Sequence, residues 1–187
     1  QNLLVRSQAL YPVELQAHQF INLFNIFFNV IFQISNYCIY MTKNSKDVVI
    51  TSAFRTAIGK YKGIWQDLQS FNLGELVIKK IIKESNLDPN LVDEVIMGQV
   101  LTGNVGQNPA RQAAMRAGIP KEKTGYIINQ VCGSGLRSIV TGFQSILLND
   151  AKIIIAGGQE SMTNSSEEEM LKDGLIDAYN NYHMGVT

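Results

Sequence analysis

A cysteine lies between an apolar run and a helical pattern in the segment 126–137, which reads YIINQVCGSGLR. The β-branched residues before Cys132 predict a buried strand that stops there, and the apolar spacing over 136–147 predicts an amphipathic helix. A cysteine at the start of a helix lies near the positive end of the helix dipole, which favours the nucleophilic thiolate. Gly133 and Gly135 allow a sharp turn and close approach of a substrate. The segment therefore indicates a nucleophile, although an inert cysteine buried in the core fits the local pattern equally well.

Few other residue types in the chain could build a metal or cofactor site. The two histidines, His18 and His183, are far apart and lack cysteine neighbours, so they give no zinc spacing and we expect no metal. The glycine pairs that follow the apolar runs 92–100 and 152–156 match neither the dinucleotide nor the P-loop spacing. We interpret them as tight turns and expect no nucleotide cofactor.

The chain has 187 residues, enough for one core of ordinary size or one domain with an appendage. Its 16 basic and 16 acidic side chains cancel, so nothing indicates binding to nucleic acid or electrostatic attachment to a membrane. Two cysteines do not form a disulfide framework and fit a reducing compartment. We therefore expect a cytoplasmic location, with the mitochondrion as the alternative.

Residues 1–40 differ in composition from the rest of the chain. No acidic residue, lysine or arginine occurs between Glu14 and Lys43, and 20–40 is rich in Phe, Ile, Asn and Tyr. Amide side chains recur there at helical spacing, which makes unassisted crossing of a bilayer costly: Asn22, Asn25, Asn29, Gln33 and Asn36. Three interpretations remain: non-coding DNA read in frame, a targeting or membrane segment, and an amphipathic helix. We treat 1–40 as an extension and Met41 as a natural start.

After Met41, predicted strands alternate with predicted helices. We expect strands at 47–52, 92–100, 126–132 and 152–156, and helices at 73–85, 109–116 and 136–147. Asn72 and Asn108 are the expected N-caps of the first two helices. This alternation predicts an α/β layered fold of βαβαβαβ order with a mostly parallel sheet.

Five motifs in one order carry a resemblance to a known family. They read VITSAFRTAIG at 49–59, DEVIMGQ at 93–99, GQNPARQ at 106–112, NQVCGSGLR at 129–137 and AGGQESM at 156–162. Together they resemble the N-terminal half of a thiolase, in the acetyl-coenzyme A C-acetyltransferase branch. The resemblance implies the thiolase-like layered fold, with an N-terminal domain at 41–164 and the truncated start of the family's loop subdomain at 165–187.

The same resemblance implies a reaction and a site. Cys132 is then the nucleophile that accepts the acyl group in the reversible condensation of two acetyl-CoA to acetoacetyl-CoA and CoA. Its backbone N–H, at a helix start, is placed to hold the thioester oxygen. His183 and Met184 are then substrate-binding residues, unless they are a surface histidine and a core methionine. The expected partner is an acyl-CoA substrate, with no further cofactor.

Two departures from the family pattern limit these expectations. The family's second half carries a histidine that activates the nucleophile, a second cysteine that moves the α-proton, and an asparagine that orders a catalytic water. The chain stops at Thr187 before any counterpart. We therefore expect the 187-residue chain alone to be inactive. The connection 164–170 also lacks a loop that the family uses for tetramers, so a homodimer is the expected assembly of the whole enzyme. The alternatives are a ketoacyl-synthase-type condensing enzyme of the same fold and a non-catalytic interaction half.

Overall fold

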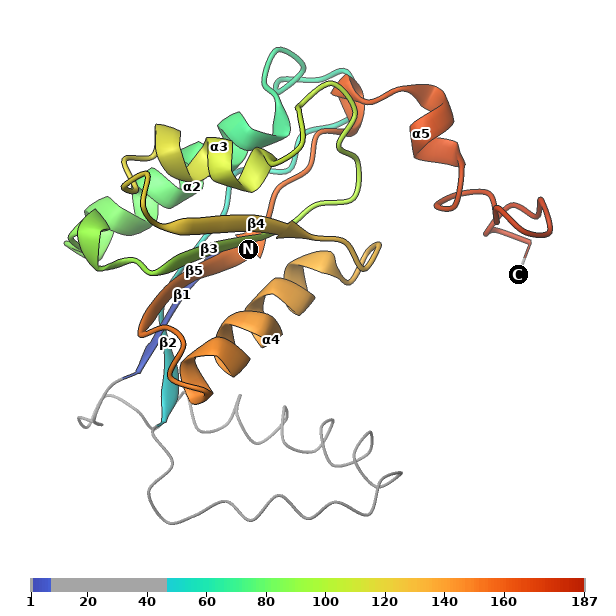
Figure 1. Ribbon diagram of the computed structural model, residues 1–187. Helices are drawn as coiled ribbons and strands as arrows, with labels where there is room; N and C mark the ends of the chain where they lie inside the picture. The colour runs from blue at the N-terminus through green and yellow to red at the C-terminus, as the bar shows by residue number, and fades with distance from the viewer. Residues whose placement is uncertain (1, 8–46, 187) are drawn as a thin grey trace, which may run out of the picture. The chain divides into compact units, whose positions relative to one another are not determined.

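The computed structural model describes residues 2–7 and 47–186 (Figure 1). The amide-rich stretch 20–40, with Cys38, and His18 lie outside the described residues. Within the two described ranges, no helix combines the length and apolar character needed to cross a membrane.

Strands and helices alternate along the chain from the first strand after residue 47 to the last. The strands are β1 Asn2–Ser7, β2 Val48–Phe54, β3 Glu94–Gly98, β4 Thr124–Ile128 and β5 Ile153–Gly158. The helices are α2 Ser70–Glu84, α3 Pro109–Arg116, α4 Ser134–Leu147 and α5 Glu167–Leu171, with short 3-10 turns at Pro89–Leu91 and Met162–Asn164. From β2 to β5 the order is βαβαβαβ, so the predicted α/β class is confirmed.

The sheet has the strand order β2-β1-β5-β3-β4. β3 pairs in parallel with both β5 and β4, whereas β1 is antiparallel to both of its neighbours. β2 therefore runs in the same direction as β3, β4 and β5. The mostly parallel sheet expected from the sequence is thus formed by strands that follow residue 47.

β1 comes from the part of the chain that the sequence analysis set aside as an extension. Its residue Leu4 is opposite Ile155 of β5, and Val5 is opposite Ile50 of β2. The register with β2 shifts between Leu4 and Val5. β1 therefore lies inside the sheet, between two strands that do not pair directly.

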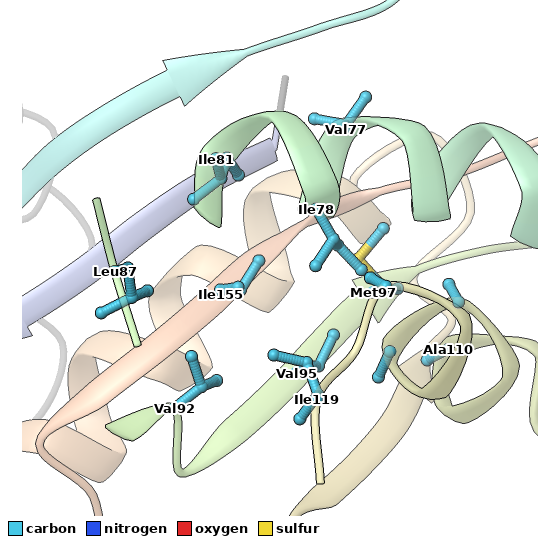
Figure 2. Close-up of a cluster of buried hydrophobic side chains, with 13 residues drawn as sticks. Val77, Ile78, Ile81, Leu87, Val92, Val95, Met97, Ala110, Ile119 and Ile155 are labelled. Carbon is cyan, nitrogen blue, oxygen red and sulfur yellow. The ribbon is translucent and has the colours of Figure 1, made fainter. Parts of the chain in front are cut away.

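Helices cover both faces of the sheet: α2 and α3 lie on one face and α4 on the other (Figure 1). Figure 2 shows Ile78 and Ile81 of α2 among the buried side chains that include Val95 and Met97 of β3. Ile96, between those two β3 residues, belongs to the second buried cluster, on the α4 side. Alternate residues of β3 thus enter opposite layers, which explains its uninterrupted apolar sequence.

The helix caps agree with the sequence in one case and differ in another. Asn108 caps α3 as predicted: its side chain accepts a hydrogen bond of 3.0 Å from the Arg111 N–H. The prediction for α2 was wrong, because this helix begins at Ser70 rather than after Asn72. Asn72 lies in the first turn instead, where its Oδ1 accepts a hydrogen bond of 3.1 Å from the Gln69 N–H.

Candidate active site

The start of α4 lies close against the carboxyl end of β3. A Cβ atom on Gly98, the last residue of β3, would lie 2.3 Å from the Ser134 carbonyl carbon. Only a residue without a side chain allows this approach. The helix start therefore has a fixed position at the edge of the sheet where parallel strands of α/β folds present their functional residues.

Cys132 lies in the turn that joins β4 to α4, next to the helix cap Gly133. β4 ends at Ile128, so the turn begins earlier than the sequence analysis predicted, but the strand–turn–helix arrangement is confirmed. The free thiol of Cys132 belongs to an exposed residue, which excludes the alternative of a cysteine buried in the core. Cys132 is thus an exposed residue just before a 14-residue helix.

The backbone of this turn has an unusual conformation. Val131, immediately before Cys132, has φ of 49°, in the left-handed region. Two overlapping turns close around it, through Gly133 N–H to Gln130 carbonyl and Ser134 N–H to Val131 carbonyl hydrogen bonds of 3.0 Å each. The chain therefore reverses sharply at the cysteine.

Two carboxylates hold the loop that follows β3. Glu160 accepts hydrogen bonds from the backbone N–H groups of Val100 (2.9 Å) and Leu101 (3.2 Å). Glu169 of α5 accepts two bonds of 2.8 Å from the next two N–H groups, those of Thr102 and Gly103. Burial raises the pKa of the Glu160 carboxyl above its ordinary value, although the two N–H groups act in the opposite direction.

Neither Glu160 nor Glu169 was predicted from the sequence to have a role in the site. Glu160 belongs to the AGGQESM motif, which was the only signal that could have drawn attention to it. It also lines a cleft of about 560 Å³, together with the loop 56–61, Trp65 and residues 161–163. The interactions of Glu169 depend on the tertiary structure and have no local sequence signal.

His183 and Met184 lie in the segment after α5, and both are exposed. The His183 ring nitrogen Nδ1 accepts a hydrogen bond of 3.0 Å from the Gly185 N–H, and the Met184 N–H donates to the Leu175 carbonyl at 2.8 Å. None of the hydrogen bonds among the described residues joins this segment to Cys132. Their substrate-binding role therefore stays a prediction, but Met184, with 55% of its surface exposed, is not a core residue of the described structure.

Comparison with known proteins identifies relatives along most of the described chain. The family model described as "Thiolase, N-terminal domain" matches residues 48–170. "Acetyl-CoA acetyltransferase" of Paracoccus denitrificans is 45% identical over 155 residues, which cover 74% of this chain and 40% of that protein. The protein of the same name from Rhizobium meliloti (strain 1021) is 44% identical over 160 residues, 77% of this chain and 41% of the relative.

A relative with a broader name shows a similar match. "Probable acetyl-CoA acyltransferase" of Staphylococcus epidermidis is 42% identical over 157 residues, covering 75% of this chain and 40% of that protein. The chain thus spans about 40% of the length of the curated relatives it matches. The matched family segment contains β2 to β5, α2 to α4 and Cys132.

Proposed function

The chain belongs to the thiolase family, and from this premise we propose that it provides the acyl-accepting nucleophile of an acetyl-CoA C-acetyltransferase. The observation that carries the proposal is the exposed Cys132 thiol in the turn before α4. The names of the relatives support acetyl-CoA as the substrate.

The proposed first step transfers an acetyl group to the cysteine. The Cys132 thiolate attacks the carbonyl carbon of acetyl-CoA, and an S–C bond forms while the carbonyl oxygen takes the negative charge. The bond between the carbonyl carbon and the CoA sulfur then breaks. CoA leaves as a thiolate and takes up the proton that Cys132 gave up. The product is an acetyl-cysteine and free CoA.

The second step makes the carbon–carbon bond. A base removes a proton from the methyl carbon of a second acetyl-CoA, and this carbon attacks the carbonyl of the acetyl-cysteine. Acetoacetyl-CoA forms, and the Cys132 thiolate is released. The base is a group other than Cys132, because this sulfur carries the acetyl group at that stage.

Each step is reversible. In the cleavage direction the Cys132 thiolate attacks the keto carbon of acetoacetyl-CoA, the carbon–carbon bond breaks, and the leaving carbon takes up a proton to give acetyl-CoA. CoA then attacks the acetyl-cysteine and releases the Cys132 thiolate.

His183 and Met184 complete the proposal as residues that contact the acyl-CoA substrate. Both side chains are exposed, as contact with a bound substrate requires. The whole enzyme is proposed to be a homo-oligomer, a dimer in preference to a tetramer, because the connection 164–170 lacks the loop that the family uses for tetramers. Its proposed location is a reducing compartment, the cytoplasm, because an exposed catalytic thiol must stay reduced.

Acetylation of the purified 187-residue chain tests the proposal. We expect slow transfer from acetyl-CoA to Cys132, detected as one added acetyl group on the peptide that contains it. The C132S variant should take up no acetyl group, and the matched C38S variant should react as the wild-type chain does. Acetylation confined to Cys38 would refute the assignment of the nucleophile.

We also expect no turnover in acetoacetyl-CoA thiolysis by this chain alone. Thiolysis needs a base for the nucleophile and a separate acid for the leaving carbon. The described residues bring no histidine into hydrogen-bond contact with Cys132. Sustained CoA-dependent cleavage of acetoacetyl-CoA by the 187-residue chain would contradict this expectation.

A further inference from the structure

Val131 adopts a conformation that valine avoids. Its φ of 49° lies in the left-handed region, where the β-branched side chain crowds the backbone. Burial of the valine does not explain the conformation, because 46% of its surface is exposed. The surrounding groups must therefore impose it.

Two neighbouring side chains bond the backbone on each side of this residue. The Asn129 Oδ1 accepts a hydrogen bond of 2.9 Å from the Val131 N–H. The Ser134 hydroxyl accepts one of 2.8 Å from the Gln130 N–H and donates one of 2.6 Å to the Val131 carbonyl. A serine hydroxyl can accept and donate at once, so one side chain fixes both ends of the Gln130–Val131 unit.

Ser134 is itself held in place. It is the first residue of α4, with 4% of its surface exposed, and its backbone lies against Gly98 of β3. A hydroxyl anchored in this way transmits the position of the sheet and helix to the turn. A strained backbone conformation persists only where several surrounding interactions hold it, and such strain is concentrated at functional sites.

We propose that Asn129 and Ser134 are positioning residues that hold Val131 in the left-handed conformation and thereby aim the thiol and the backbone N–H of Cys132 together at one acyl carbonyl. This inference deepens the proposed function and rests on it. Acyl transfer needs the sulfur at the carbonyl carbon while a donor meets the oxygen that becomes negative. The Val131 backbone sets the direction in which both Cys132 groups leave the turn, so a relaxed turn would align one group or the other but not both.

The test compares two reactions of the same sulfur in chains that carry C38S. Acetylation by acetyl-CoA needs both Cys132 groups, whereas alkylation by iodoacetamide forms no oxyanion and needs only the sulfur. The variants are S134A, N129A, V131G and the double variant S134A/V131G. S138A is the matched control, because Ser138 is a fully buried serine of the same helix. Its hydroxyl lies 2.7 Å from the Gly135 and Gly157 carbonyls and makes no hydrogen bond to the turn.

We expect S134A to lower the ratio of acetylation to alkylation rates by about tenfold, below the effect of deleting an oxyanion donor outright. N129A should lower it less, and S138A should leave it unchanged. V131G should restore the ratio in the double variant, because glycine adopts the left-handed conformation without cost. The proposal would be overturned by equal ratios of acetylation to alkylation rates in S134A and S138A. It would also be overturned if this ratio in S134A/V131G were no higher than in S134A.

Amide hydrogen exchange separates this inference from the proposed function. If the wild-type chain takes up no acetyl group, the proposed function fails, but the positioning claim is still decided by the Gln130 and Val131 amides. We expect the Gln130 amide to exchange faster in S134A than in S138A, and the Val131 amide to exchange faster in N129A. Unchanged exchange at both amides would show that these side chains do not hold the turn.

Discussion

Replacement of Gly98 by alanine tests whether β3 sets the position of the helix that follows Cys132. The added Cβ would lie 2.3 Å from the Ser134 carbonyl carbon, 2.4 Å from the Gly135 nitrogen and 2.5 Å from the Ser134 oxygen. All three are backbone atoms, which cannot rotate away as a side chain can. The start of α4 would therefore have to move by about 1 Å to restore ordinary van der Waals contact.

The expected cost follows from overpacking. Extra carbon in a well-packed site destabilises the folded state by about 1–3 kcal/mol. The φ of Gly98 is not in the left-handed region, so alanine adds no backbone strain. Alanine also lowers the conformational entropy of the unfolded chain, which offsets only about 0.4–1 kcal/mol of this destabilisation. We expect G98A to lower the free energy of unfolding by about 1–2 kcal/mol. The displacement should also slow acetylation of Cys132, since a shift of this size at a reacting group can cost up to about 100-fold.

Urea denaturation measures the first effect, with the fluorescence of Trp65, the single tryptophan of the chain, and circular dichroism as two probes. If the slope of the unfolding free energy against urea concentration is the same in G98A and wild type, the substitution has changed stability alone. The matched control is G135A in the first turn of α4, where the nearest atoms to the added Cβ are those of Gly158 at 3.9 Å. This control should be neutral or stabilising, because alanine favours a helix. Equal stability of G98A and wild type, or equal loss in G135A, would refute the reasoning.

Two further predictions concern partly buried carboxylates, those of Glu160 and Asp93. Because burial raises the pKa of Glu160, the folded state binds this proton more tightly than the unfolded state. The contribution of Glu160 to stability is present below the ordinary value of 4.5 and is lost as pH rises through the raised pKa. The unfolding free energy of wild type should therefore fall relative to that of E160Q over this range, and a constant difference would contradict the assignment. Asp93 accepts hydrogen bonds from the N–H groups of Lys152 (2.8 Å) and Ile153 (3.2 Å), so D93A should cost about 1–2 kcal/mol in urea denaturation. The exposed Asp67 supplies the control D67A, and an equal effect of both variants would show that these bonds do not matter.

The sequence predicted the part of the fold that depends on local patterns. The alternation of apolar runs and helical spacing was sufficient for the βαβαβαβ order, since each element buries its own periodic face. The cap at Asn108 was predictable because its signal, an asparagine before a proline, is local. The prediction that Asn72 is the N-cap was wrong because an asparagine can bond the helix start either from the cap position or from the third residue of the helix.

The details of the site needed tertiary structure. The exposed cysteine before a helix was predictable from NQVCGSG. The left-handed conformation of Val131 was not, because β-branched residues such as valine rarely adopt it. The hydrogen bonds of the Ser134 hydroxyl were not predictable either, because they form only in the folded conformation of this turn. Glu169 bonds N–H groups more than sixty residues earlier in the chain, and no local pattern specifies such a pair.

The position of β1 has a consequence for how the sheet can be completed. β1 precedes the other described strands in the chain, but its partner strands are β2 and the much later β5, so its pairing closes long loops and is expected late in folding. A chain translated from Met41 would lack β1 and so lose a strand from the interior of the sheet. β5 would then present an unpaired edge, and β2 would lose its only partner among the described strands. Unpaired edges recruit strands from other chains. Residues 2–7 would thus decide whether the β1 side of β5 is covered within the chain or free to pair with another chain.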